Sequence, residues 1–207
     1  MNKWQAEWQY VEKQFKESGL DSFGGKYTGS CTFRSRYQHT KRVYKWLHEI
    51  LEDNDEVDVE AMELAIIFHD VGYTKGDNKL HPFNSKDMFL EYANDKEWDE
   101  ELINKVAYFI ENHSNKYLME KEDTPKELIY IMESDVMDEE GAMRIAWDCM
   151  AYGIQDAKCF EGALEHTKKF WDPAYNPMIT PKAKKIFEEK QALVKEYVSQ
   201  LTHDLAI

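Results

Sequence analysis

Hydrophobic residues recur along the chain at the spacing of amphipathic helices. Near the N-terminus, Trp4, Trp8, Val11 and Phe15 share one helical face. From about Ser35 to Leu51 the apolar positions follow the i, i+3, i+4, i+7 rule, and they are Val43, Trp46, Leu47, Ile50 and Leu51. These patterns predict two helices with an inward apolar face. Between them, the glycine-containing stretch SFGGKYTGSC breaks the helical pattern.

The segment VDVEAMELAIIFHDVGY is almost continuously apolar before His69, which predicts a buried helix. We expect this helix to end at Gly72 with a left-handed C-terminal cap. Further helices are predicted within SKDMFLEYAN, around Trp98 to His113, from about Thr124 to Val136, and within GAMRIAWDCMAYG. Thr180 as N-cap and Pro181 at the first helical position introduce the last one. With no strand pattern, the sequence predicts an all-α helical bundle, in a single domain over residues 1–207.

Composition narrows the range of partners. The net charge of −14 gives a field that repels polyanions, so we expect no nucleic acid polymer as partner and only local capture of an anionic substrate. The 3 cysteines include no CxxC pair, which suits a reducing compartment. No stretch has the apolar length of a membrane span, and the N-terminus lacks a secretion signal, so we expect a cytoplasmic protein with no membrane partner.

Four ionisable residues occupy positions where the helical pattern expects apolar ones. His39 lies one helical turn before Val43, on the inward face of its helix. His69 and Asp70 directly follow a buried apolar run, and Asp135 extends the apolar stripe of a later helix. An unpaired buried carboxylate costs several kcal/mol, and two close together would repel each other. A shared cation would relieve both costs.

The simplest common explanation is a divalent metal bound by His39, His69, Asp70 and Asp135. Mixed nitrogen and oxygen ligands suit Mn, Fe, Co, Ni or Zn better than Ca or Mg, and the residue types do not choose among these metals. Taken singly, each of the four residues could equally be a histidine hydrogen-bonded in the core or an aspartate that caps a helix. Taken together, the four residues have few structural alternatives, and they predict a metal site.

The order and context of these residues resemble the HD-domain superfamily of metal-dependent phosphohydrolases. The matching segments are HTKRVYKWL at His39, AIIFHDVGY at His69 and Asp70, and ESDVMDEEGA at Asp135. In the last segment, Ser134 and Met137 differ from the residues that are usual in the family, but neither is a proposed metal ligand. The segment ITPKAKKIFEEKQALVKEYVSQL is similar to the closing helix of a small bacterial single-domain branch, so the resemblance runs from about residue 35 to 201. It implies cleavage of a phosphoester or phosphoanhydride bond in a small phosphorylated molecule, commonly a nucleotide.

In such a site the metal activates water for attack on phosphorus, and Asp70 is expected both to bind the metal and to orient that water. His113 continues the apolar stripe of its helix, so it should face the pocket. His81 lies in the polar connection KLHPFNS, where histidines are often exposed to solvent. Either histidine could donate a proton to the leaving oxygen or bind a second metal.

A basic segment surrounds His39. Residues 22–48 contain no Asp or Glu, and their cations are Lys26, Arg34, Arg36, Lys41, Arg42 and Lys45. Arg36 and Arg42 flank His39 by about one helical turn, so we expect them to bind phosphate. Lys75 and Lys79, in the connection after Asp70, are further candidates for substrate binding. The alternative for each cation is a solvated helix face. Aromatic residues that could stack on a base, or belong to the core, are Tyr73, Phe83 and Trp147.

Two other functions stay open from the sequence. Some HD-like helical proteins activate oxygen with a di-iron version of the site, which would require both His81 and His113 as iron ligands. A non-catalytic module that senses a nucleotide would keep the pocket without turnover. The sequence does not fix the oligomeric state, and a homo-oligomer is compatible with it.

Overall fold

The computed structural model describes residues 3–19, 35–76, 78–155 and 159–206. These residues form α-helices and two short 3-10 helices with no strand, which confirms the predicted all-α fold. The elements are α1 (Gln5–Ser18), α2 (Arg36–Ile50), α3 (Val59–Phe68), η1 (Val71–Lys75), α4 (His81–Ala93), α5 (Glu100–Asn112), η2 (Lys116–Glu120), α6 (Lys126–Met137), α7 (Ala142–Gln155), α8 (Phe160–Phe170) and α9 (Pro181–Leu205). The stretch SFGGKYTGSC, with Lys26 and Cys31, and the nearby Arg34 lie outside the described residues.

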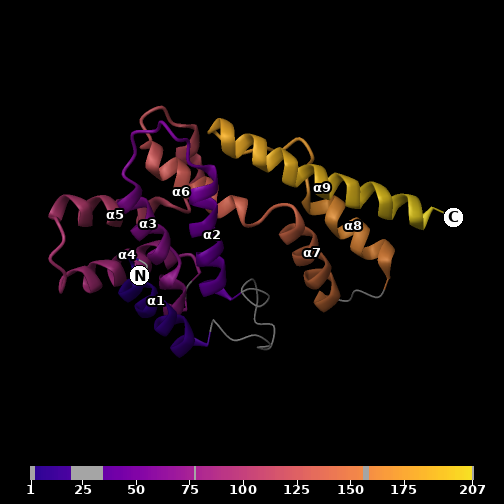
Figure 1. Ribbon diagram of the computed structural model, residues 1–207. Coiled ribbons are helices and arrows are strands. Elements are labelled where there is room, and N and C mark those ends of the chain that lie inside the picture. The colour runs from indigo at the N-terminus through magenta and orange to yellow at the C-terminus, as the bar shows by residue number, and fades with distance from the viewer. Residues whose placement is uncertain (1–2, 20–34, 77, 156–158, 207) are drawn as a thin grey trace.

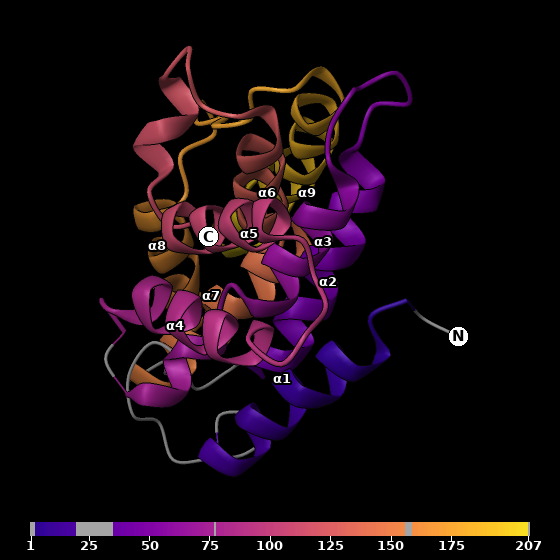
Figure 2. The same ribbon diagram turned by 90° about the vertical axis from the view of Figure 1, so that its left-hand side faces the viewer.

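Helix α3 is the centre around which the fold is built. It packs against α1, α2, α5 and α6, and every side chain from Leu64 to Phe68 is fully buried, as the apolar run predicts. Figures 1 and 2 show α7, α8 and α9 packed together beside this group. Within the part of the chain that the structure describes, no helix is both long and apolar enough to cross a membrane.

Side-chain caps begin three of the helices near the centre of the fold. Ser35 accepts a hydrogen bond from the Gln38 N–H at the start of α2. Asp58 caps α3 and Asp99 caps α5 in the same way. Each cap satisfies a backbone donor that has no partner within its own helix, so these short polar residues fix where the helices start.

Helix α3 ends at Phe68, earlier than the predicted end at Gly72, and the left-handed residue is Gly76 with φ 89°. Gly72 is needed for a different reason, because a Cβ there would lie 2.2 Å from the His81 carbonyl oxygen. Without that side chain, α4 starts directly against η1, and Ser85 Oγ accepts a 2.8 Å hydrogen bond from the Gly72 N–H. His81 is therefore the first residue of α4 and is buried, which corrects the expectation of an exposed loop histidine.

Helix α8 occupies a segment for which the hydrophobic pattern predicts no helix. Its buried positions are only Leu164 and Thr167, while Phe160 and Phe170 at its ends are exposed. It is held in place by packing against α7 and α9.

Glu133 on α6 holds the start of α9. Its fully buried carboxylate accepts hydrogen bonds from the N–H groups of Ile179 and Thr180 and from the Thr180 hydroxyl. The predicted N-cap Thr180 therefore bonds to α6 and makes no side-chain cap bond to its own helix. Burial raises the pKa of Glu133, although the hydrogen bonds from Thr180 and Ile179 oppose that rise. The α9 helix is thus fixed to the helix that carries Asp135.

Replacing Glu133 with alanine should lower the free energy of unfolding by about 3 kcal/mol, because buried donors lose their acceptor. Chemical denaturation at neutral pH measures this change. Glu189→Ala, at an exposed position of α9, is the matched control and should shift stability by less than about 0.5 kcal/mol. Equal midpoints for the two variants would show that α9 is held by other contacts.

Candidate metal centre

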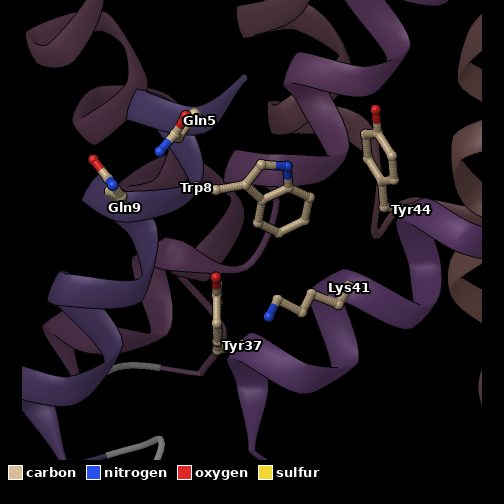
Figure 3. Close-up of a pocket in the computed structure, with 6 residues that line it drawn as sticks. All are labelled: Gln5, Trp8, Gln9, Tyr37, Lys41 and Tyr44. Carbon is tan, nitrogen blue, oxygen red and sulfur yellow. The ribbon is translucent and has the colours of Figure 1, made fainter. Parts of the chain in front are cut away.

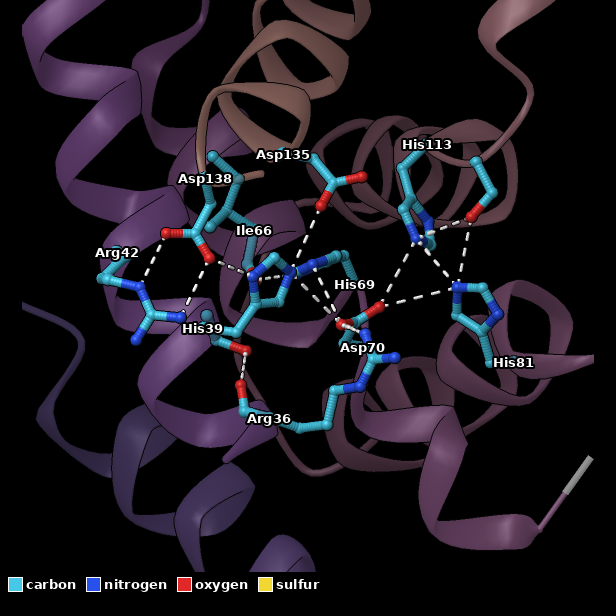
Figure 4. Close-up of polar contacts among 12 residues, drawn as sticks. Arg36, His39, Arg42, Ile66, His69, Asp70, His81, His113, Asp135 and Asp138 are labelled. Carbon is cyan, nitrogen blue, oxygen red and sulfur yellow. Dashed lines mark hydrogen bonds and ion pairs between the residues drawn. The ribbon is translucent and has the colours of Figure 1, made fainter. Parts of the chain in front are cut away.

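The fold brings together all four residues predicted as metal ligands and adds two histidines to them (Figure 4). His39 comes from α2 and Asp135 from α6. His69 and Asp70 lie between α3 and η1. The additional histidines are His81, at the start of α4, and His113, which follows α5. His39, His69, His81 and His113 are all buried, as is Asp70.

Two of these histidines are placed by the ends of helices. His69 is the C-cap of α3, and its Nδ1 lies 2.7 Å from the Ile66 carbonyl oxygen. His113 follows α5 in the same way, with Nδ1 2.6 Å from the Ile110 carbonyl oxygen. Carbonyls in the last turn of a helix lack an intrahelical partner, so an imidazole N–H that donates to one of them closes the helix end. This arrangement directs Nε2 of each ring away from its helix.

The same pattern fixes the tautomer of all four histidines. Each Nδ1 faces an oxygen acceptor, and the acceptors of His81 and His39 are the Asn78 carbonyl, at 2.7 Å, and an Asp138 carboxylate oxygen, at 2.7 Å. Carbonyl and carboxylate oxygens only accept hydrogen bonds, so Nδ1 carries the proton and the neutral ring has its lone pair on Nε2. Each ring thus presents a metal-binding nitrogen.

The four Nε2 atoms converge on the Asp70 carboxylate, two at each oxygen. His39 and His69 Nε2 each lie 3.5 Å from Oδ2. His81 Nε2 lies 3.5 Å and His113 Nε2 3.7 Å from Oδ1. Two groups of potential ligands result, His39, His69 and Asp70 on one side and Asp70, His81 and His113 on the other. Asp70 belongs to both groups.

These residues fit divalent cations on chemical grounds. His69 Nε2 is buried without a hydrogen-bond partner among the described residues, and burial lowers the pKa of His69 to about 4. His81 Nε2 lies 3.1 Å from His113 Nε2, and burial also lowers the pKa of His81. The Ser114 hydroxyl lies 3.1 and 3.0 Å from these two nitrogens and can donate a proton to only one of them. The remaining lone pair and the Asp70 carboxylate repel unless a cation lies between them. Adjacent ligands with metal–nitrogen bonds of about 2.1 Å are separated by roughly 3 to 3.5 Å, close to the spacing seen here.

Both aspartates are held in the charged form. Burial alone would raise the pKa of Asp70, but His69 and the Arg36 guanidinium beside it keep that pKa well below its usual range. The pKa of Asp135 is likewise held well below its usual range, because the Lys116 ammonium and His39 outweigh the effect of burial. Asp135 Oδ1 lies 3.2 Å from His39 Nε2, and Oδ2 accepts a 2.9 Å hydrogen bond from Lys116. Asp135 therefore lies beside the group that contains His39, through its contact with that ring.

Asp138 is a site residue that the sequence reasoning missed. It is buried, and besides His39 it binds Arg42, whose Nε and Nη2 lie 2.6 and 3.0 Å from the two carboxylate oxygens. Burial would raise the pKa of Asp138, but these hydrogen bonds lower it. A carboxylate behind a ligating histidine orients the ring and raises its basicity. The signal available in the sequence was a second Asp one helical turn after Asp135.

Asp138→Asn should weaken Mn²⁺ binding by about tenfold to a hundredfold, because the amide cannot pair with both His39 and Arg42 as a carboxylate does. Calorimetric titration of the metal-free protein measures the affinity. Asp95→Asn, at an exposed position, is the control and should bind like wild type. Unchanged affinity in Asp138→Asn would mean that the carboxylate only supports the fold.

The predicted substrate-binding cations lie in different surroundings. Arg42 binds Asp138 through Nε and Nη2, so these two donors support the His39 side of the centre. Arg36 is buried and donates a 2.8 Å hydrogen bond from Nη1 to Asp70 Oδ2. Lys75 and Lys79 are exposed on η1 and in the connection after it. Lys116, which was not predicted, contacts the proposed ligand Asp135.

A separate cavity of about 340 Å³ lies between α1 and α2 and contains none of the centre's histidines or aspartates (Figure 3). Its lining residues are Gln5, Trp8, Gln9, Tyr37, Lys41 and Tyr44. Trp8 packs edge-on against Tyr37 and Tyr44, with ring centres 6.0 and 5.4 Å apart. These aromatic contacts join α1 to the helix that carries His39.

The chain matches the model of the HD domain over residues 36–140, which contain every residue of the centre. Similar solved structures include the Lin1889 protein from Listeria innocua, with 21% identity and a TM-score of 0.63 over 94% of this chain and 97% of that one. YpgQ from Bacillus subtilis, in complex with ADP, has 17% identity and a TM-score of 0.63 over 97% of each chain. An HD-superfamily hydrolase from Bacillus thuringiensis has 18% identity and a TM-score of 0.63 over 96% of this chain and 97% of that one. No curated protein sequence matches. The chain belongs to the HD domain family.

Proposed function

We propose that this protein releases phosphate or pyrophosphate from a small phosphorylated compound, with nucleotides as the substrate class, at a centre for two divalent cations. The broader class, a metal-dependent hydrolase, follows from the HD domain and its histidine and aspartate donors. The observation that carries the proposal is Asp70, whose two carboxylate oxygens each face two imidazole nitrogens. The ADP bound to the structurally similar YpgQ supports a nucleotide.

In this proposal, His39, His69, Asp70 and Asp135 hold one cation, and Asp70, His81 and His113 hold the other. A ligand role for His81 and His113 is favoured over proton donation, because both Nδ1 atoms face carbonyl oxygens and burial lowers the pKa of His81. Neutral rings in this tautomer have no proton on Nε2 to give to a leaving group.

Bound metal supplies a Lewis acid that activates water and neutralises charge on a phosphoryl oxygen. The chain itself positions the reactants. Asp70 lies between the two ligand groups, where its carboxylate can accept a hydrogen bond from the attacking water and orient it toward phosphorus.

Besides Arg42, two cations of the chain border the centre, Lys116 and Arg36. Lys116 contacts Asp135 with a side chain that is 35% exposed, so its ammonium can also be reached from solvent. Arg36 lies at Asp70 with a side chain only 6% exposed. A partly exposed Lys116 suits direct contact with substrate, whereas a buried Arg36 acts by balancing the charge of Asp70.

The test is a panel of nucleoside mono-, di- and triphosphates and simple phosphoesters, offered to protein loaded with Mn²⁺, Co²⁺ or Ni²⁺. We expect release of phosphate or pyrophosphate from at least one member, abolished by chelation and by His69→Ala. His203→Ala, an exposed histidine of α9, is the control and should keep full activity. A metal-loaded protein that cleaves no member would overturn the proposal and favour a nucleotide-sensing module.

A second candidate function has one observation in its favour. An oxygen-activating di-iron centre would require His81 and His113 as ligands, and both rings do face Asp70. Anaerobic and aerobic assays of iron-loaded protein separate the two functions. Product formation that needs oxygen and two bound irons would favour oxidation, whereas phosphate release without oxygen would favour hydrolysis.

A further inference from the structure

Tyr73 lies in η1, three residues after Asp70, and its ring is covered on both faces. The Arg36 Cζ lies 3.8 Å from the ring centre. The His81 imidazole stacks on the same ring, with centroids 4.0 Å apart and planes at 17°. Two planar groups this close to one ring centre would collide on a single face, so the ring lies between them. Tyr73 is therefore not available to stack on a base, as the sequence had suggested.

Both groups that cover the Tyr73 ring also face Asp70. Arg36 Nη1 donates to Asp70 Oδ2 at 2.8 Å, and His81 Nε2 lies 3.5 Å from Oδ1. The Tyr73 N–H donates to the Asp70 carbonyl oxygen at 3.1 Å, so ring and carboxylate belong to one backbone turn. These contacts thus form a closed circuit around the Asp70 carboxylate, which runs through Arg36, Tyr73 and His81.

These contacts define the orientation of the His81 ring plane, which the hydrogen bonds of His81 alone do not define. The hydrogen bonds of His81, from Nδ1 to Asn78 and between Nε2 and the Ser114 hydroxyl, hold two points of the imidazole. They leave the tilt of its plane about the line through those points undefined. Stacking on Tyr73 defines that plane, and on the other face the ring attracts the Arg36 guanidinium. The ring is itself held firmly, because Gly72 lets the first turn of α4 pack against η1.

We infer that Tyr73 is a positioning residue that holds His81 and Arg36 against opposite oxygens of Asp70. It thereby sets the metal affinity of the position formed by Asp70, His81 and His113. The effect on affinity rests on the proposed two-cation centre. The effect on the His81 ring does not, since it follows from contacts within the chain.

The first test titrates Mn²⁺ into metal-free wild type, Tyr73→Phe and Tyr73→Leu by calorimetry. Wild type and Tyr73→Phe should bind two ions with matching affinities, because phenylalanine keeps the ring. Tyr73→Leu should bind one of the two ions about tenfold more weakly and the other unchanged. Wild-type affinities in Tyr73→Leu, or an equal loss in Tyr73→Phe, would overturn the inference. Tyr73→Met gives a second non-aromatic variant should the leucine variant fail to fold.

The second test needs no metal. The His81 and His113 rings lie 5.1 Å apart, so their ring protons should give a nuclear Overhauser effect in the metal-free protein. We expect this signal in wild type and Tyr73→Phe and its loss in Tyr73→Leu. An unchanged signal in Tyr73→Leu would overturn the positioning role. If wild type binds a single Mn²⁺, the two-cation centre fails and this comparison alone decides the role of Tyr73.

Discussion

Asp70→Asn should bind neither metal ion tightly and should lose about three orders of magnitude or more in kcat/KM. The expectation follows from the position of Asp70 in both ligand groups, since one substitution removes a charged ligand from each. Loss of metal-based stabilisation of the transition state is worth several kcal/mol, and each tenfold in rate corresponds to about 1.4 kcal/mol. Metal analysis and phosphate release measured on one sample test both parts.

Asp95→Asn, at its exposed position, is the control for this variant, and circular dichroism checks that both proteins fold. The Arg36 guanidinium would lose the negative charge of Asp70 in Asp70→Asn, so some loss of stability is also expected. Full metal content in a folded Asp70→Asn protein would contradict the placement of Asp70 at the junction of two ligand groups.

His113→Ala should bind one metal ion instead of two and should lose roughly a hundredfold in kcat/KM. The variant removes a ligand only from the group that contains His81 and leaves the contacts among His39, His69 and Asp135 in place. Metal stoichiometry measured beside steady-state kinetics therefore separates the two positions.

The exposed His203→Ala serves as the control for His113→Ala. Full activity with one bound ion in His113→Ala would make the protein a single-metal hydrolase, in which His81 and His113 support the fold. Loss of both ions would instead mean that the two positions fill only together.

Periodicity was a reliable guide to most of the helices, although not to α8, and to their inward positions. His39 on the stripe of Val43 and Asp135 on the stripe of α6 were inferred from local spacing, and the structure places both at the centre. Such inferences work because a helix buries one face, whatever it packs against. The boundaries of α3 and α4 could not be inferred in this way, since they depend on the contact between Gly72 and the first turn of α4.

Long-range partners account for what the sequence did not reveal at the site. Arg42 lies one turn after His39, as expected, but its guanidinium is bound by Asp138, which follows α6 and lies 96 residues further along the chain. Lys116 was missed because its position beside Asp135 depends on η2 packing against α6. Residue type and spacing fix which way a side chain leaves its helix, and they do not fix which charge it meets.

The histidines that close α3 and α5 give the helix ends a second role. In each of these histidines, Nδ1 lies against a carbonyl oxygen in the last turn of the helix, and Nε2 faces the centre. Helix ends normally fray, and a ligand that binds only the folded form opposes that opening by mass action. Amide hydrogen exchange in the final turns of α3 and α5 should therefore slow when the centre is filled. Backbone order at two helix ends would then report occupancy directly, without a substrate.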